Sequence, residues 1–411
     1  MTHTWRVVFL LSLVSCVAYL VRADVAVAQE RMVPALGLSM TGMGAITAWG
    51  FQLSYALFQV PAGLFGERFG ARTALMLAML GCSAASFITG LMPAAHDAAF
   101  TTLVFTRVLL GMSQAAVFPV AAMAVMEYVP SDQRVRATSI YIATSSLGAA
   151  LAPLLMAPVM ERYGWRAVFL VSGTVGALTA VLWRALMSPK TIVSAAERQA
   201  ASGSVLRNLV AMLGNSQLRR LSLAYLLHSA VWFGFVFWFF RYLTEGRGFT
   251  VLASGVWGSL PSIASFVLAP LIGVGADRLG RRVGTARARR RVAIACLLGA
   301  ACFVAAGAVL PSAVLAIAAL SLSSACVNGA EAPFFMTATA IGGAHPGASA
   351  GALNLMGNLG GVLSIWLVPH MSEAWGWNLT LAFWSGVCVT AALLWLTVSA
   401  DDVVPAVPAA A

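Results

Sequence analysis

Charged and amide side chains inside apolar stretches are the residues of this sequence that could do chemistry. In the stretch 5–27, Tyr19 and Arg22 are three residues apart and therefore share one face of a helix, and Asp24 follows them. The fork of N–H donors on a guanidinium suits a carboxylate, so Arg22 is a candidate anion-binding group. The alternative is that Arg22 extends from the end of its stretch to the lipid headgroups.

A second polar face lies in the stretch 101–126. Arg107, Gly111, Gln114 and Phe118 follow one another at helical spacing and form one continuous face. Gln114 lies near the middle of its stretch, at the depth where the substrate sites of many transporters lie. Its amide could bind a hydroxyl or carboxyl group of a ligand, or it could only join two helices.

The second half of the chain has its own polar candidates. Glu331 is the only acidic residue deep within an apolar stretch of that half, and we interpret it as a proton carrier. The alternative is a permanent salt bridge from Glu331 to Arg22 or Arg107. Amides and aromatic residues that could contact the substrate are Trp232, Asn354 and Asn358. The stripe of His228, Trp232 and Phe235 is also typical of simple packing.

Membrane-spanning helices must position these residues. Of the 411 residues 60% are hydrophobic and 9% are charged, whereas about 25% of a soluble domain is charged. A spanning helix needs about 20 apolar residues, and the predicted fold is an all-α integral membrane protein with twelve such helices. The apolar runs are 5–27, 43–65, 73–92, 101–126, 137–160, 166–187, 219–243, 252–274, 290–310, 313–337, 348–370 and 378–398.

One long polar connection divides these runs into six plus six. We predict a first half at 1–187, a connecting loop at 188–217, a second half at 218–400 and a short tail at 401–411. Most of the 25 basic residues fall on one side if the N-terminus is inside, so both termini are expected in the cytoplasm of a multi-pass cell-membrane protein. The same loop arginines explain the net charge of +11 without nucleic acid.

Two internal repeats relate the halves. The pattern G-x-x-x-acid-R-x-G-x-R, interpreted as a charged turn, runs from Gly63 to Arg72 and again from Gly273 to Arg282. A Gly-Trp pair precedes the sixth run as Gly164-Trp165 and the twelfth as Gly376-Trp377, and Trp183 and Trp395 close those two runs. These tryptophans also suit an interfacial aromatic belt. Equal positions in two apolar halves are typical of transporter folds.

The repeated decapeptide resembles the loop motif of the major facilitator superfamily. In that family the acid and the arginines latch the cytoplasmic ends of neighbouring helices in one state of the transport cycle. The resemblance implies this role for the first-copy residues Gly63, Glu67, Arg68, Gly70 and Arg72, and for the second-copy residues Asp277, Arg278, Gly280 and Arg282.

Four further segments resemble the anion:cation symporter family of that superfamily. They are Tyr19-Leu20-Val21-Arg22, Arg107-x-x-x-Gly111 with Phe118-Pro119, Trp238-Phe239-Phe240-Arg241-Tyr242-Leu243, and Gly357-Asn358-Leu359-Gly360-Gly361. The family takes up sugar acids and other carboxylates, usually with protons, and its matching arginine, here Arg22, binds the anion. Val21 and Gln114 stand where the family has its proton-handling acids.

The resemblance therefore implies a secondary transporter of a small organic anion, coupled to protons through another group such as Glu331. The alternatives are an uncoupled facilitator or exchanger, and a transport-dead membrane sensor or scaffold. No H-E-x-x-H, G-x-S-x-G or phosphate-loop motif indicates an enzyme. The six cysteines lie in apolar runs without metal spacing, and we expect no metal, no cofactor and a monomer within the bilayer.

Overall fold

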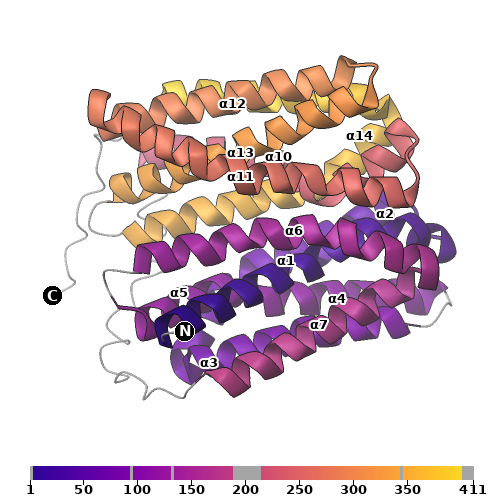
Figure 1. The fold of residues 1–411 in the computed structure, drawn as a ribbon. Helices are drawn as coiled ribbons and strands as arrows, with labels where there is room; N and C mark the ends of the chain where they lie inside the picture. Colours follow the sequence, from indigo (N-terminus) through magenta and orange to yellow (C-terminus); the bar gives the residue numbers. More distant parts are fainter. Residues whose placement is uncertain (1–2, 93–95, 131–133, 188–213, 343–345, 400–411) are drawn as a thin grey trace. The chain divides into compact units, whose positions relative to one another are not determined.

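The chain folds almost entirely into long helices (Figure 1). The computed structural model describes residues 3–92, 96–130, 134–187, 214–342 and 346–399. Its α-helices are α1 His3–Ala35, α2 Met40–Ala45, α3 Leu53–Leu91, α4 His96–Ala115, α5 Val117–Tyr128, α6 Arg134–Tyr163, α7 Trp165–Leu186, α10 Ser216–Arg241, α11 Val251–Val283, α12 Thr285–Val309, α13 Ala313–Gly342 and α14 Pro346–Leu396. Two π-helical segments, Ile46–Gln52 and Tyr242–Gly246, continue α2 and α10.

Ten helices of the described chain are long and apolar enough to cross a membrane. One of them, Ser349–Leu396, contains two spans, because Gly376 interrupts α14 at φ 74° and ψ 170°. Gly70 divides α3 in the same way, at φ 77°, and the helical segment from Met40 to Gly70 is the second span of the chain. Only glycine adopts such positive φ values without strain. The predicted twelve-helix membrane fold is thereby confirmed.

The Gly-Trp repeat has the same backbone in both halves. Gly164 precedes α7 at φ 82°, and Gly376 precedes the last span at φ 74°. Trp183 and Trp395 are 0% and 1% exposed, so the aromatic-belt interpretation of these two residues is wrong. They are packing residues, and the indole of Trp183 donates to the carbonyl oxygen of Arg72 at 3.0 Å.

The two decapeptides differ in where the chain turns. In the first copy the turn falls at Gly70, inside the motif. In the second copy α11 continues through Gly280 to Val283, and the positive φ of 89° falls at Gly284. The prediction of a turn inside the motif is therefore right for the first copy and wrong for the second, because the glycine just beyond the second motif takes the left-handed conformation.

The described chain forms two compact units. Unit 1 comprises Met1–Ile192, Val236–Phe266 and Ile365–Glu373. Unit 2 comprises Val193–Phe235, Val267–Ser364 and Ala374–Ala411. Both units contain buried polar side chains.

Glycines hold the helices of unit 1 close together. A Cβ added at Gly148 of α6 would lie 2.0 Å from the carbonyl oxygen of Cys16 in α1. A Cβ at Gly111 of α4 would lie 2.0 Å from Ser54 Oγ and 2.4 Å from the carbonyl oxygen of Phe51. Small residues allow such close approach of helices in membranes. These contacts fix α1 and α4 against their neighbours, and both helices carry site residues.

Unit 2 uses the same device between α10 and α14. A Cβ at Gly360 would lie 2.1 Å from the carbonyl oxygen of Leu226, and a Cβ at Gly357 would lie 2.4 Å from the Tyr225 ring. The Tyr225 side chain belongs to a buried cluster that also contains Phe334 of α13 and Trp395 of α14. The face of α10 that carries Tyr225 is thereby packed against α13 and α14.

Candidate functional site

The cluster of unit 1 is centred on Arg22. This side chain is only 3% exposed, so the alternative that it extends to the headgroups is wrong. Its Nε donates to Gln114 Oε1 at 2.9 Å, and Gln114 Nε2 donates to the carbonyl oxygen of Ala18 at 2.8 Å. Because a carbonyl oxygen only accepts, this second bond fixes which end of the Gln114 amide faces the arginine. Gln114 therefore joins α4 to α1 and orients the guanidinium.

Aromatic rings surround the same guanidinium. Its central carbon lies 4.6 Å from the ring centroid of Tyr19, 4.5 Å from that of Tyr55 and 5.2 Å from that of Phe51. A cation over an aromatic face is attracted by the ring quadrupole, by ~2 kcal/mol when both are desolvated. Phe118 packs edge-on against Tyr19, with ring centroids 5.8 Å apart. The rings hold the positive charge inside unit 1 and leave it uncancelled.

No acidic side chain among the described residues forms an ion pair with Arg22. Its recorded side-chain acceptors, Gln114 and the Tyr55 hydroxyl, are neutral, and a guanidinium has five N–H donors. A buried, oriented and uncompensated guanidinium is suited to a carboxylate, which supplies both the missing charge and further acceptors.

Arg107 has different surroundings from Arg22. Its side chain is 1% exposed, and it interacts electrostatically with Asp24, which is 0% exposed. Its Nη2 donates to Thr89 Oγ1 at 3.1 Å, and its guanidinium lies 5.5 Å from the Phe169 ring centroid. Asp24 is the acidic group that acts on Arg107, although the two side chains form no recorded ion pair among the described residues. We therefore interpret Arg107 as half of a structural pair, in contrast to Arg22.

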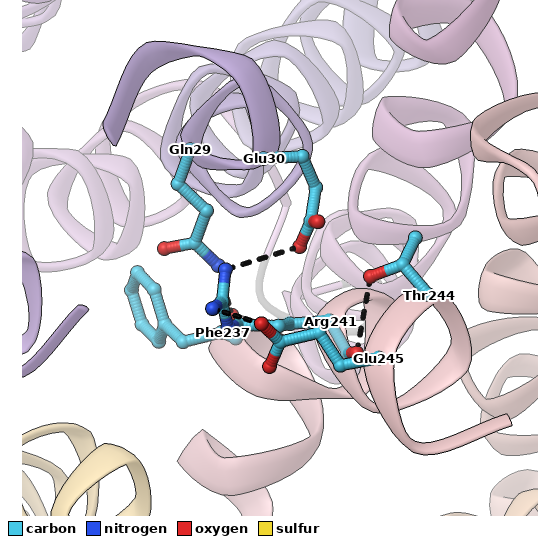
Figure 2. A network of polar contacts seen from close by, with 6 residues as sticks. All are labelled: Gln29, Glu30, Phe237, Arg241, Thr244 and Glu245. Carbon is cyan, nitrogen blue, oxygen red and sulfur yellow. Dashed lines mark hydrogen bonds and ion pairs between the residues drawn. The ribbon is translucent and has the colours of Figure 1, made fainter. Parts of the chain in front are cut away.

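A third polar group ties α1 to the last turns of α10 within unit 1, as Figure 2 shows. Arg241 lies between two carboxylates: its Nη1 is 3.7 Å from Glu30 Oε1, and its Nη2 is paired with Glu245. Gln29 Nε2 donates to the carbonyl oxygen of Phe237 at 3.3 Å. Thr244 Oγ1 donates to the carbonyl oxygen of Arg241 at 3.1 Å. This network was not predicted, because its members lie at the ends of apolar runs.

The cluster of unit 2 contains Glu331. Tyr225 donates its hydroxyl to Glu331 Oε1 at 2.6 Å, and His228 Nδ1 lies 3.7 Å from Glu331 Oε2. His228 Nε2 lies 2.8 Å from the carbonyl oxygen of Val327. The sequence analysis named an arginine as the alternative partner of Glu331, and no arginine is recorded as its partner within unit 2. Glu331 there faces a histidine and a tyrosine.

The comparison with family models identifies the family of the chain that contains these clusters. The model of the Major Facilitator Superfamily matches residues 8–365. The chain belongs to this superfamily. It is therefore a multi-pass membrane protein of a transporter family, as the repeated decapeptide predicted.

Two bacterial relatives match nearly the whole chain. A D-galactonate transporter of Escherichia coli O6:H1 is 26% identical over 418 residues, which cover 94% of this chain and 93% of the relative. A probable galactarate/D-glucarate transporter of Bacillus subtilis is 25% identical over 414 residues, which cover 95% and 91%. The crystal structure of a bacterial homolog to the human lysosomal transporter Spinster, inward-facing and occupied, has a TM-score of 0.78 at 16% identity over 97% of each chain. At that identity the likeness concerns the fold alone.

The remaining candidate contacts of this superfamily member lie in unit 2. Trp232 packs edge-on against Phe233, with ring centroids 4.7 Å apart. The Asn358 amide donates to the carbonyl oxygen of Asn354 at 2.9 Å, along the axis of α14. Trp232 and Asn354 are half-buried, and Asn358 is 4% exposed. Their contact with a substrate stays a prediction.

The predicted superfamily latch has no recorded ion pair among the described side chains. Arg72 Nη2 donates to the carbonyl oxygen of Arg184 at 2.7 Å, and the Arg68 guanidinium lies 5.4 Å from the Phe69 ring centroid. Asp277, Arg278 and Arg282 are exposed. The Glu67 side chain lies outside the described part. The latch roles of both copies stay a prediction.

Sequence reasoning named Tyr19 at the Arg22 cluster but missed Phe51 and Tyr55 there, and Tyr225 in unit 2. Phe51 and Tyr55 approach Arg22 from the π-helical segment Ile46–Gln52 and the start of α3. Their segment, Phe51-Gln52-Leu53-Ser54-Tyr55, was not recognised as part of a site, although π-helical turns are frequent at functional sites. In unit 2 the helical spacing of Tyr225 and His228 was a usable signal, since residues three apart share a face. The described residues contain no group of acidic, histidine and cysteine side chains that could hold a metal ion.

Proposed function

We propose that this superfamily member is a secondary transporter that carries a sugar acid or a related small carboxylate by alternating access. The observation that supports this most directly is the buried Arg22 guanidinium, which Gln114 orients and which no described acidic side chain pairs. In this proposal Arg22 binds the carboxylate bidentately. The hydroxyl group of Tyr19 and the amide of Gln114 bind the substrate's hydroxyl groups, and substrate contact by Asn354, Asn358 and Trp232 of unit 2 stays a prediction.

The names of the two relatives favour this substrate class. One is named for D-galactonate and the other for galactarate and D-glucarate, all of which are polyhydroxylated carboxylates. The cationic Arg22 opposes transport of cations by the same site. We propose a monomer in the cell membrane as the working unit.

The test is a flux assay with purified protein in liposomes. D-Galactonate and D-glucarate are the probes, and protein-free liposomes are the control. We expect protein-dependent uptake of at least one probe and competition by the other. A thermal-shift measurement adds a binding readout, because a ligand at 100 times its dissociation constant stabilises a protein by about 2.7 kcal/mol. Binding without flux would favour the sensor or scaffold alternative. The absence of both binding and flux would contradict the proposal.

Proton coupling through Glu331 is part of the proposal, since Val21 and Gln114 do not titrate. The Glu331→Gln variant should lose accumulation driven by a pH gradient and should keep substrate-for-substrate exchange. Persistent gradient-driven accumulation in this variant would show that another group carries the proton. If the wild-type protein exchanges substrate without responding to a gradient, the facilitator or exchanger alternative is correct.

We also propose that both termini and the 188–217 loop lie in the cytoplasm, and that the decapeptide residues latch the cytoplasmic ends. Single cysteines at Gly203 and His96, in a background without the six native cysteines, test the orientation. A membrane-impermeant reagent should label position 203 from the inside and position 96 from the outside. Labelling of both positions from one side would contradict the orientation.

A further inference from the structure

We propose that His228 and Glu331 of unit 2 together form a single proton-binding site, in which Tyr225 holds the carboxylate in place. This inference rests on the proposed transport function for its role, since it names the group that shares the proton with Glu331. The site itself follows from the orientation of the His228 ring and from what each of its nitrogens faces.

The first step is the tautomer of His228. Nε2 lies 2.8 Å from the carbonyl oxygen of Val327, and a carbonyl oxygen only accepts hydrogen bonds. Nε2 must therefore carry a hydrogen in every protonation state of the ring. It follows that Nδ1 is the nitrogen that gains or loses a proton.

The second step is what Nδ1 faces. It is buried, it has no hydrogen-bond partner among the described residues, and Glu331 Oε2 lies 3.7 Å away. Without a proton, a nitrogen lone pair faces a carboxylate oxygen, and the two repel each other. With one proton on Nδ1 or on Oε2, the pair attracts. The geometry therefore favours one proton in the space between the two atoms.

The third step is that ring packing and a hydrogen bond keep the His228 ring and the Glu331 carboxylate from moving apart. The His228 ring stacks on the Tyr225 ring, with centroids 5.4 Å apart and an interplanar angle of 18°. Phe334 packs against both rings, at 5.0 Å from His228 and 5.1 Å from Tyr225. Tyr225 also donates to Glu331 Oε1 at 2.6 Å, which leaves Oε2 for the histidine.

The groups that face the pair come from the helices of unit 2. Tyr225 on α10 is the titratable side chain in direct contact, and Cys296 of α12 belongs to the same buried cluster. From α11 and α14 the cluster receives Ile272 and Trp395, which carry no charge. The His228 side chain is 1% exposed and that of Glu331 is 44% exposed. In this proposal a proton therefore enters and leaves the pair through the exposed carboxylate.

The net charge of the pair indicates what such a site would do in a transport cycle. The empty pair carries one negative charge, and the loaded pair carries none. In this proposal the two groups share one proton, which is bound and released once per cycle. Co-transport of one proton with a monocarboxylate such as galactonate then moves no net charge, whereas a dicarboxylate such as glucarate leaves one negative charge to be carried.

The first experiment measures the proton without any substrate. Infrared difference spectra of the purified full-length protein between about pH 5 and pH 8 should contain a carboxyl band that is absent in Glu331→Gln. In His228→Gln the side-chain amide can still donate to the Val327 carbonyl, but it cannot take a second proton. We expect the midpoint of the Glu331 band to move by about one pH unit or more, a tenfold change in proton affinity.

The matched control is His370→Gln. His370 also bonds to a main-chain carbonyl, with Nδ1 2.8 Å from the Trp366 oxygen, and it has no recorded ion pair with a described carboxylate. Its replacement should leave the Glu331 band unchanged. An unshifted band in His228→Gln, or the absence of a Glu331-dependent band in the wild-type protein, would overturn the shared site.

The second experiment measures coupling in liposomes with D-galactonate as the probe. His228→Gln should lower gradient-driven accumulation about tenfold and leave substrate exchange within about twofold. Loss of exchange together with an unshifted Glu331 band would show that His228 serves the substrate instead. If the wild-type protein moves no sugar acid at all, the proposed function fails, while the infrared result still decides whether the proton site exists.

Discussion

The Arg22 cluster of unit 1 and the His228–Glu331 pair of unit 2 share several features, and they differ in the residue that faces the charged group. In each, a side chain that also bonds to a main-chain carbonyl orients a charged group: Gln114 orients Arg22, and His228 faces Glu331. Aromatic rings enclose both. The difference is that Gln114 cannot titrate and His228 can. The charge in unit 1 is therefore permanent, and the charge in unit 2 depends on a proton.

In our proposal this difference gives the two units separate tasks. A permanent, uncompensated cation is suited to a substrate that is always ionised, because it attracts the carboxylate at every pH near neutrality. A carboxylate beside a histidine is suited to a proton, because one of the two groups must be protonated for the pair to attract. The partner residue, more than the charged residue, determines which ligand each cluster can hold.

The largest effect is expected from Arg22→Lys. A lysine retains the charge but cannot make the planar contacts with Gln114 and a carboxylate, so affinity for D-galactonate should fall ~100-fold, about the 1.5–3 kcal/mol of a hydrogen bond to a charged group. Equilibrium binding to the purified protein measures this loss. Arg31→Lys is the control, because Arg31 lies on the same helix, is half-exposed and pairs with Glu161 at 2.7 Å. Unchanged affinity in Arg22→Lys would exclude the Arg22 cluster as the anion site.

A smaller effect, on stability, is expected from Gly111→Ala. The added Cβ would meet Ser54 Oγ at 2.0 Å and the Phe51 main chain at 2.4 Å, so α4 must move away from the segment that carries Phe51. Overpacking of this kind costs ~1–3 kcal/mol and should lower the melting temperature. It should also weaken anion binding and spare the Glu331 infrared band in unit 2. Gly386→Ala is the control, since no heavy atom lies within 4 Å of its added Cβ.

Much of this arrangement could be predicted from sequence, and the limits have physical causes. The twelve apolar runs and the Gly-Trp repeat follow from local composition, and spacing alone places Tyr19 and Arg22 on one face. The joining of Gln114 to Arg22 needed the packing of α4 on α1. Because Glu331 and His228 are far apart in sequence, their pairing depends on the packing of α10 against α13. The sequence could not show that the second turn falls at Gly284 and not at Gly280, because both residues are glycines and either could adopt a positive φ.

Gln114→Glu should reduce affinity about tenfold near neutral pH, and the sign of its pH dependence follows from hydrogen bonding. An ionised glutamate would cancel the charge of Arg22 and would face the Ala18 carbonyl with an acceptor. A protonated glutamate would donate to Ala18 and accept from Arg22, as the glutamine does. Binding of D-galactonate should therefore improve as the pH falls in the variant, relative to the wild-type profile measured in parallel. A variant profile that parallels the wild type would show that Gln114 does not control the charge seen by the anion.

The smallest effect is expected from Glu245→Gln, which concerns an arginine that already has acidic partners. Arg241 pairs with Glu245, whose side chain is 43% exposed, and with Glu30, whose side chain is 12% exposed. Exposed pairs four residues apart on a helix contribute only ~0.3–0.5 kcal/mol. Removal of Glu245 should therefore lower the melting temperature only slightly, and Glu30 would still compensate Arg241 (Figure 2).

The informative measurement on Glu245→Gln is anion affinity, with Glu30→Gln beside it as the more buried counterpart. If a carboxylate site requires an arginine without an acidic partner, both variants should bind D-galactonate as the wild type does, because Arg241 keeps one carboxylate in each. The double variant Glu30→Gln with Glu245→Gln removes both partners and supplies the contrasting case. A gain in anion binding there would show that an uncompensated, partly buried arginine is sufficient. No gain would show that the amide and the aromatic rings around Arg22 are needed as well, and that charge alone does not make the site.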